Sequence, residues 1–455
     1  MTALLWYRRD LRVADHPALH AALEAGRVVP VFCLDDRLLH GRHASGPRTQ
    51  FLLECLRDLD RSLRERGSGL VVRHGRPERE LVRLAREVDA TAVHASADGG
   101  PFAARRDVRV AGVILHPGLG AVDESPRTKA GRPYTVFTPF HRAWLAAGRR
   151  DVLGAPDALP ALPSKVRKGR VPALGALGLE QEVAEPLPGG ERAGRARMAR
   201  FLAGGVRDYA DAHDGLDRDG TSRLSAYLHF GCISARELED SLPRGAGPDA
   251  FRRQLCWRDF YQHVLEHFPA NARSEFQERY RGGRLRWSYA RRRFERWCAG
   301  QTGFPLVDAG MRQLLREGWM HNRARLVVGS FLTKDLGIDW RWGERHFMRL
   351  LIDGDEANNN GNWQWIASVG VDPQPAFRRI YNPALHMERF DPDGAYVRRY
   401  VPELRPVPDR HLPEPWTMPE ALQREVGCVI GVDYPAPMVD HAQARREALA
   451  RYRDA

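Results

Sequence analysis

The chain has 455 residues, of which 43% are hydrophobic and 28% charged, and its formal net charge is +12. This composition excludes a disordered chain, and the basic excess fits a polyanion partner, although a solvated basic surface would give the same charge. The six cysteines form no CxxC pair or metal-ligand spacing and no apolar run reaches the length of a membrane span, which excludes a zinc-binding domain and a membrane-spanning protein.

The first 125 residues alternate short apolar runs with amphipathic stretches. The runs that we expect to be strands are residues 3–7, 28–34, 69–75, 90–96 and 112–116. Between the first two lies DHPALHAALEAG, which has an Asp cap, an early Pro and a closing Gly, as helices do. The alternation predicts a doubly wound α/β domain with a parallel sheet. WYRRDLR stands where a GxGxxG motif would follow the first strand, so a dinucleotide site of the usual kind is not supported there.

The rest of the chain divides into a connecting segment and a helical part. Residues 126–195 are rich in Pro, Gly, Ala and Arg without steady periodicity, which predicts a connection. From residue 196 onward long helical patterns dominate, as in residues 249–268 and 308–336, so we predict an all-α domain over residues 196–455. Nine of the eleven tryptophans lie beyond residue 250. One tryptophan most often fills a core, but nine in one helical half favour a function for some of them.

Three polar clusters in the helical half favour a pocket for a large polar ligand. GTSRLS (220–225) offers hydroxyls and backbone N–H groups ahead of a helical run, which suits a phosphate, although Ser and Thr also cap helices. In HNRAR, Asn322 and Arg325 share one helix face, and an acid such as Asp335 could fix the arginine. DGDEANNNGNWQW (353–365) adds two Asp that can accept hydrogen bonds from a ribose or a ring N–H.

Long motifs occur in order along nearly the whole chain. They include WYRRDLRVADHPAL, YTVFTPFHRAWL, GTSRLSAYLHFG, CWRDFYQH, GWMHNRARLVVGSFLTKDL and DGDEANNNGNWQW. With these motifs the sequence resembles the DNA photolyase and cryptochrome flavoproteins, most closely the bacterial class I cyclobutane pyrimidine dimer photolyases. The resemblance implies a helical FAD-binding domain and light-driven repair of cyclobutane pyrimidine dimers in UV-damaged DNA, by an electron from excited, fully reduced FAD.

The resemblance assigns most of the polar cluster residues to FAD. It implies eleven contacts, from Tyr209, Thr221, Ser222, Leu224, Ser225, Arg258, Asn322, Arg325, Asp353, Asp355 and Asn359. Arg325 would pair with Asp335 beside the isoalloxazine, and Asn359 would face flavin N5, with a simple turn residue as the alternative. The resemblance also implies a chain of tryptophans that passes an electron to the flavin, with ordinary core packing as the alternative. Its members would be Trp287, Trp340 and Trp363.

The lesion would be flipped out of the duplex and held between aromatic walls, Trp257 and Trp365. The candidates for contact with DNA are Trp257, Arg323, Leu326, Trp365, Arg378 and Arg379. For the arginines a solvated surface is the alternative. Two positions depart from the dimer-photolyase pattern, because Gln254 replaces a Glu that bonds the damaged bases and Leu326 replaces a Met.

The departure at Gln254 leaves the lesion open. Gln at this position also occurs in relatives that repair (6-4) photoproducts, but those relatives carry paired His where this chain has His321 and Asn322. We therefore expect the cyclobutane lesion first, with an altered lesion preference or a cryptochrome-type photoreceptor as alternatives. A light-independent nucleic-acid-binding helical protein is a further alternative, which a bound flavin would exclude.

The N-terminal domain resembles a domain that holds an antenna chromophore in this family. FCLDD (32–36) with Arg48 fits 8-hydroxy-5-deazaflavin better than methenyltetrahydrofolate, which makes Cys33, Asp35 and Arg48 the antenna candidates. DGGPF (98–102) lacks an acid that relatives place beside the second chromophore, so an empty pocket stays an alternative. We expect no metal and a monomer. We expect the protein in the cytoplasm, because MTALLWYRRDLR does not resemble a signal peptide.

Overall fold

Five short strands near the N-terminus form one parallel sheet in the computed structural model, which describes residues 1–455. The strands are β1 (Thr2–Tyr7), β2 (Arg27–Leu34), β3 (Val71–His74), β4 (Ala90–Ser96) and β5 (Val113–His116). Their order in the sheet is β3-β2-β1-β4-β5. This order confirms the predicted doubly wound α/β fold. Both ends of each strand lie within two residues of their predicted positions.

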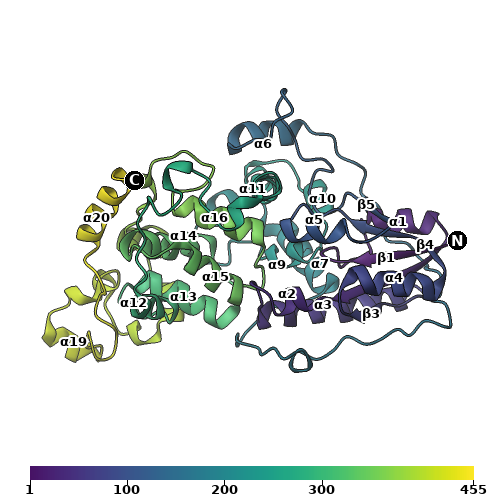
Figure 1. Cartoon of the computed structure of the whole chain (residues 1–455). Helices are drawn as coiled ribbons and strands as arrows, with labels where there is room; N and C mark the ends of the chain where they lie inside the picture. The colour runs from purple at the N-terminus through teal and green to yellow at the C-terminus, as the bar shows by residue number, and fades with distance from the viewer.

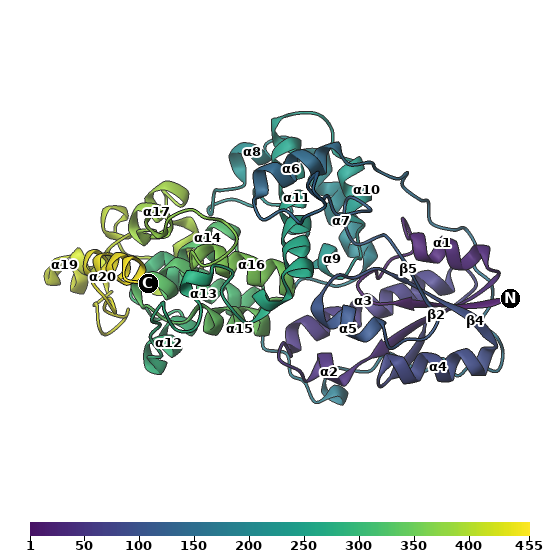
Figure 2. The same cartoon turned by 45° about the horizontal axis from the view of Figure 1, so that its top comes forward.

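Alternate residues of β1 pack on opposite faces of the sheet. Leu5 and Tyr7 join the hydrophobic cluster of α1 (Pro17–Glu24) and α3 (Gly46–Arg64). Leu4 and Trp6 pack in another cluster with α4 (Pro77–Val88). This period of two follows from the pleat of a strand. Helices therefore cover both faces of the sheet (Figure 2), together with α2 (Asp36–Leu39) and α5 (Pro101–Asp107).

The connection between the sheet and the helical half contains α6 (Phe137–Ala146) and one short 3₁₀ turn. The remainder runs around the sheet as an irregular segment (Figure 1). The Val72 N–H donates to the Lys168 carbonyl at 2.7 Å, so this segment covers the edge strand β3. One hydrophobic cluster continues from β1 to residues of the helical half as far as Ile352. We keep the division of the chain at residues 125 and 195 as a proposal.

The C-terminal half is helical, as its sequence pattern predicts. Its helices are α7 (Glu191–Arg200), α8 (Tyr209–Ala212), α9 (Ser225–His229), α10 (Ala235–Asp240), α11 (Ala246–His267), α12 (Arg291–Cys298), α13 (Pro305–Glu317), α14 (Asn322–Ser330), α15 (Trp340–Leu350), α16 (Glu356–Ile366), α17 (Pro383–Phe390), α18 (Ala395–Tyr400), α19 (Glu420–Val426) and α20 (His441–Arg453). The pattern over residues 308–336 forms more than one helix, because Gly318 adopts φ +61° and ends α13.

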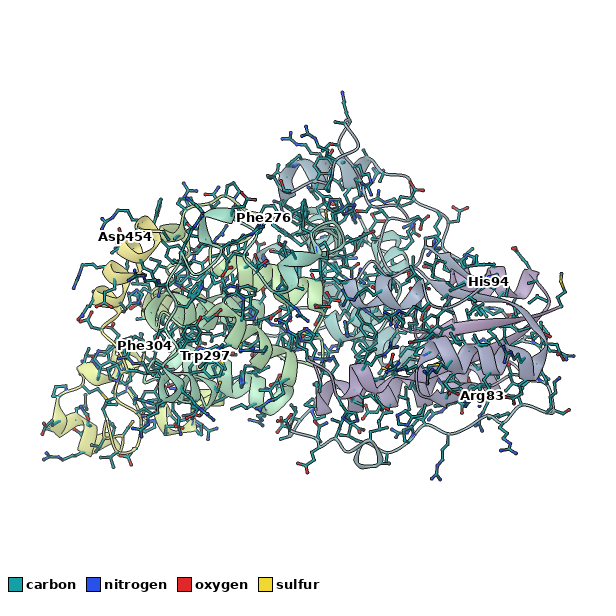
Figure 3. All side chains as sticks on the ribbon, viewed as in Figure 1. Arg83, His94, Phe276, Trp297, Phe304 and Asp454 are labelled. Atoms are coloured by element: carbon teal, nitrogen blue, oxygen red, sulfur yellow. The ribbon has the colours of Figure 1, made fainter.

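The helices from α12 onward pack around a core of their own, in which the labelled Trp297 and Phe304 lie (Figure 3). α11 and α16 approach closely, since a Cβ added at Gly361 would lie 2.1 Å from Cδ1 of Tyr261. This contact sets the helix that carries Gln254 and Trp257 beside the helix that carries Asn359 and Trp365. Every helix of the structure is either too short or too polar to traverse a lipid bilayer.

Candidate functional site

One cavity of about 510 Å³ in the helical half gathers most of the predicted site residues. All eleven positions predicted to contact FAD line it. The other predicted residues in its wall are Gln254, Trp257, Arg323, Leu326, Trp363 and Trp365. These side chains come from α8, from α9 and the turn before it, from α11, α14 and α16, and from the segment between α15 and α16, so only the packing of distant segments brings them together.

The GTSRLS segment forms the turn before α9 and presents hydroxyls to the cavity. Thr221, Ser222 and Ser225 line the wall, and the Ser222 hydroxyl accepts the Leu224 N–H at 3.3 Å. Arg223 adopts the left-handed conformation, with φ +51°, and its guanidinium pairs with a carboxylate of α13 at 3.2 Å. The arginine is therefore satisfied by the protein, while the hydroxyls remain for a ligand such as a phosphate.

Arg325 pairs with Asp353 and not with Asp335, which corrects the prediction. Its Nη2 lies 2.8 Å from Asp353 Oδ2, whereas Asp335 is bonded to Nδ1 of His441. Residues ten apart on a helix are separated by about 80° around the axis and about 15 Å along it, so Arg325 and Asp335 face different neighbours. The second oxygen of Asp353 is buried without a partner, which leaves an acceptor for a ligand N–H or O–H in the cavity wall.

Asp355 caps α16 and joins the helical half to the sheet. One carboxylate oxygen accepts the Asn358 N–H at 2.9 Å, and the other pairs with Arg9, two residues beyond β1, and lies 3.5 Å from His229 Nδ1. Burial alone would raise the pKa of Asp355, but Arg9, His229 and the Asn358 N–H together hold this pKa well below its ordinary value. The carboxylate therefore stays charged, and it depends on a side chain of the N-terminal domain.

Asn359 and Trp363 lie one turn apart on α16. The Asn359 Nδ2 donates to the Glu344 carbonyl at 3.0 Å, which leaves its own carbonyl oxygen for the cavity. Trp363 lines the cavity, Trp340 is fully buried and Trp287 is partly exposed. The three tryptophans thus occupy wall, interior and surface, which is the arrangement that an electron path between the surface and the cavity needs.

Trp365 is held at the cavity mouth by two charged side chains. Its Nε1 donates to Asp372 Oδ2 at 3.0 Å, and the Arg379 guanidinium lies 4.0 Å from the ring centre. Arg379 also donates to Asp372 at 2.6 Å and to the Trp365 carbonyl at 2.7 Å. Because Arg379 is only 2% exposed, the predicted phosphate contact at this residue is wrong, whereas Arg378 is exposed.

Trp257 stacks on Phe137, a residue to which the sequence alone assigned no role. The two ring centres are 3.6 Å apart and the planes are within 2° of parallel. Phe137 lies within the YTVFTPFHRAWL motif, so the length of that motif was the one available signal. Gln254 lies exposed on α11 one turn before Trp257, and Leu326 is half-buried. These residues surround an entrance to the cavity. The sequence also carried no signal for Arg9 and Asp372. Arg9 pairs with Asp355, which is distant in sequence, and Asp372 lies outside any helix or strand.

Arg323 is engaged within the protein although it lines the cavity. It pairs with Asp214, and its guanidinium lies 4.4 Å from the Phe390 ring centre. The side chain is 22% exposed, so part of it remains available at the mouth. Its predicted contact with DNA stays a prediction.

A second cavity of about 460 Å³ lies at the carboxyl ends of the strands and also borders the helical half. Cys33, Asp35 and Arg48 line it, as they would for an antenna site. Arg48 donates to the Met348 carbonyl at 2.5 Å and so ties α3 to α15, and burial raises the pKa of Cys33 to about 12. The structure contains no cluster of side chains that could hold a metal ion.

The sequence matches two family models and many named proteins. Residues 3–164 match the model described as DNA photolyase, and residues 251–454 match the FAD binding domain of DNA photolyase. The deoxyribodipyrimidine photo-lyase of Streptomyces griseus is 42% identical, over 97% of this chain and 97% of the relative. This chain belongs to the photolyase/cryptochrome family. A cryptochrome DASH of Gloeobacter violaceus is 37% identical to this chain, over 98% of this chain and 95% of the relative.

Solved structures of the family share the whole architecture. A class III photolyase from Agrobacterium tumefaciens has a TM-score of 0.91 and 34% identity, over 99% of this chain and 97% of that one. An archaeal photolyase from Sulfolobus tokodaii, solved with two FAD molecules, has a TM-score of 0.85 and 30% identity over 100% of both chains. These similarities confirm the predicted pairing of an α/β domain with a helical FAD-binding domain. They do not support the class I subgroup, because a class III photolyase and a DASH cryptochrome are among the relatives.

Proposed function

We propose that this protein is a deoxyribodipyrimidine photo-lyase that binds FAD in its helical half and repairs cyclobutane pyrimidine dimers in UV-damaged DNA under light. The observation that carries this proposal is one cavity of about 510 Å³ that combines a polar wall with Trp257 and Trp365 at its mouth. The name of the Streptomyces griseus relative, at 42% identity, supports the same activity.

The residues of the cavity fit FAD. The Thr221 and Ser222 hydroxyls suit the diphosphate, and the unpartnered oxygen of Asp353 suits a ring N–H or a ribose hydroxyl. The Asn359 carbonyl oxygen would accept a hydrogen bond from flavin N5, because its Nδ2 is already committed to Glu344. When bound and reduced, FAD would supply the light-driven electron that weakens the two carbon–carbon bonds of the dimer, which acids and bases cannot easily open.

The tryptophans would receive the extruded lesion. Enzymes that act on a base, photolyases among them, take the base out of the duplex before they act. Stacking of a base on an aromatic side chain is worth roughly 1–3 kcal/mol, and Phe137 and Arg379 hold Trp257 and Trp365 in place for it. Gln254 would donate and accept hydrogen bonds at the bases without adding charge. We further propose that Trp287, Trp340 and Trp363 conduct electrons between the surface and the cavity.

The second cavity would hold an antenna chromophore. We propose 8-hydroxy-5-deazaflavin in preference to methenyltetrahydrofolate, beside Cys33, Asp35 and Arg48. The structure of the archaeal relative supports a flavin-like occupant, since it contains two FAD molecules, with the implication of a novel light-harvesting cofactor. Incubation of the protein with each chromophore, followed by gel filtration and an absorption spectrum, tests the choice. Retention of neither chromophore would leave the cavity empty and contradict the proposal.

The experiment that tests the function is a repair assay on two defined lesions. The purified protein, supplied with FAD and reduced, is illuminated with oligonucleotides that carry either a cyclobutane dimer or a (6-4) photoproduct. We expect a flavin spectrum and light-dependent loss of the cyclobutane dimer, with faster repair by Gln254→Glu because the glutamate restores a charged acceptor. A protein that retains no FAD, or that repairs neither lesion, would contradict the proposal.

A cryptochrome-type photoreceptor is the second candidate, because the cryptochrome DASH relative is 37% identical. The presence of both Trp257 and Trp365 at the cavity mouth favours repair over this alternative. The same assay separates the candidates. A photoreceptor would bind FAD and respond to light, yet leave both lesions in place, and repair of the (6-4) photoproduct alone would assign the altered lesion preference.

A further inference from the structure

Residues 125–136, immediately before α6, form a narrow projection that we call the basic hairpin. Arg127 and Pro133 form an antiparallel bridge, and the Thr128 N–H donates to the Arg132 carbonyl at 2.9 Å. Gly131 closes the turn with φ +72°, a conformation that other residues rarely adopt. In Figure 1 this segment stands out from the molecule beyond α6. The hairpin therefore has a defined shape although most of it contacts no core.

Both ends of the basic hairpin are bound to α11 by hydrogen bonds. The Tyr134 N–H donates to His263 Nε2 at 3.0 Å, while Ser125 Oγ lies 2.6 Å from Nδ1 of the same ring. Because Nε2 accepts, Nδ1 carries the proton and donates to Ser125. His263 follows Trp257 on α11, less than two helical turns away, so the hairpin is anchored to the helix that carries a lesion wall.

The base of the hairpin also lines a smaller cavity that adjoins the flavin cavity at Trp257 and Trp365. Thr135 and Val136 line a cavity of about 230 Å³ whose wall includes Trp257 and Trp365. The next residue, Phe137, is the one that stacks on Trp257. The hairpin thus rises from the rim beside both tryptophans, and its tip projects into solvent.

Three cations near the tip have no ion-pair partner. Arg127, Lys129 and Arg132 are exposed, and none of them forms a salt bridge. Of the acids that precede the hairpin, Asp123 is taken by Arg150 at 3.2 Å, and Glu124 is exposed. Arg127 donates only to the Gly131 carbonyl, at 3.3 Å, and no carboxylate neutralises the three cations, so together they form a compact site for a polyanion.

We propose that the basic hairpin contacts the phosphate backbone of duplex DNA beside the extruded lesion. This inference rests on the proposed function, because it takes the mouth with Trp257 and Trp365 as the place where DNA binds. Phosphate contacts fix the position of a protein on the duplex and carry no base information. The hairpin would therefore hold damaged and undamaged duplex alike, while the two tryptophans distinguish them.

The test neutralises the tip and measures binding in the dark. The variant R127Q/K129Q/R132Q is compared with R79Q/R86Q/R109Q, which removes three exposed, unpaired arginines from the sheet domain. Fluorescence anisotropy gives the affinity for duplexes with and without one dimer at about 50 to 300 mM salt. Each lost phosphate contact lowers the slope of log affinity against log salt by about 0.9, so we expect a fall of up to about 2.7 for the hairpin variant, equal on both duplexes.

We expect the control variant to keep the wild-type slope. FAD content and the unfolding temperature establish that each variant is folded, because the tip lies outside the cavity. A wild-type slope in the hairpin variant would overturn the inference, and so would an equal fall in both variants, since that would reflect net charge alone. Failure of the proposed function would look different, because the wild-type protein itself would then repair no lesion.

Discussion

The indole of Trp365 is held from two sides, by Asp372 at its N–H and by Arg379 over its ring. We expect Arg379→Met to free the indole and so to weaken binding of dimer-containing duplex by about 5- to 160-fold, with undamaged duplex unaffected, because stacking of a base is worth roughly 1–3 kcal/mol. Arg378→Met removes an exposed neighbouring charge and serves as the control, with equal weakening on both duplexes. Dark binding titrations measure the two ratios. Equal behaviour of the two variants would contradict this role of Arg379.

The corrected partner of Arg325 leads to a second comparison at the residue scale. Asp353→Asn removes the negative charge and one of the two acceptor oxygens, so the charged hydrogen bond to Arg325, worth about 1.5–3 kcal/mol, and the acceptor for a ligand cannot both remain, and we expect the Kd for FAD to rise at least tenfold. Asp335→Asn should lower the unfolding temperature through His441 and leave FAD binding unchanged. Flavin fluorescence during titration of the apoprotein measures both constants. A similar loss of FAD affinity in both variants would show that Asp335 contributes to FAD binding and would contradict this assignment.

At the scale of elements, the contact between α15 and α16 depends on Gly343. A Cβ at this position would lie 2.2 Å from Cη2 of Trp363 and 2.6 Å from Cδ2 of Leu332. We expect Gly343→Ala to cost roughly 1–3 kcal/mol of unfolding free energy and to displace Trp363, so that light-driven reduction of bound FAD slows. Gly204→Ala has no atom within 4 Å and is the matched control. Denaturant unfolding and flavin absorbance under illumination give the two readouts, and unaltered photoreduction in the Gly343 variant would count against the proposed path.

The elements were predictable from sequence, whereas the pairings between them were not. Apolar periodicity records which face of a strand or helix is buried, and this placed β1 to β5 within a few residues. It does not record the partner that covers the face. Arg325 was therefore assigned the wrong acid, and the stack of Phe137 on Trp257 joins segments that only the folded chain brings together. The eleven positions predicted to contact FAD could be named in advance because long motifs carry them, and the structure places all of them around one cavity.

At the scale of the whole molecule, the sheet domain completes the flavin site as well as its own cavity. Arg9 pairs with the carboxylate of Asp355, and Arg48 donates to a carbonyl at the end of α15. The two cavities share His229 and Gly354 in their walls. The carboxyl edge of the parallel sheet, where ligands of doubly wound folds bind, therefore adjoins the start of α16. The two cavities therefore adjoin at His229 and Gly354, and a chromophore in the second cavity would be held by residues of both halves of the chain.

Buried histidines make the stability of the whole molecule depend on pH. Burial lowers the pKa of His229, His263 and His321 to about 4 and that of His346 to about 3. Unfolded histidine titrates near about 6.5, so between about pH 4 and 6.5 the unfolded chain binds more protons than the folded one. The stabilisation is complete above this range and is lost as the pH falls through it. We expect the unfolding temperature to drop between about pH 7 and 5.

His346 offers the sharpest test of this dependence, because its Nε2 is buried without a partner. His346→Phe keeps an aromatic ring against Trp297 and Phe294 but cannot accept a proton. We therefore expect the variant to show a shallower fall in unfolding temperature toward low pH than the wild type. At about pH 8, His346 is neutral in both the folded and the unfolded wild type, so the difference in unfolding temperature between the two proteins at this pH reports the packing change alone. Parallel curves for the variant and the wild type across the whole range would show that protonation of His346 does not contribute.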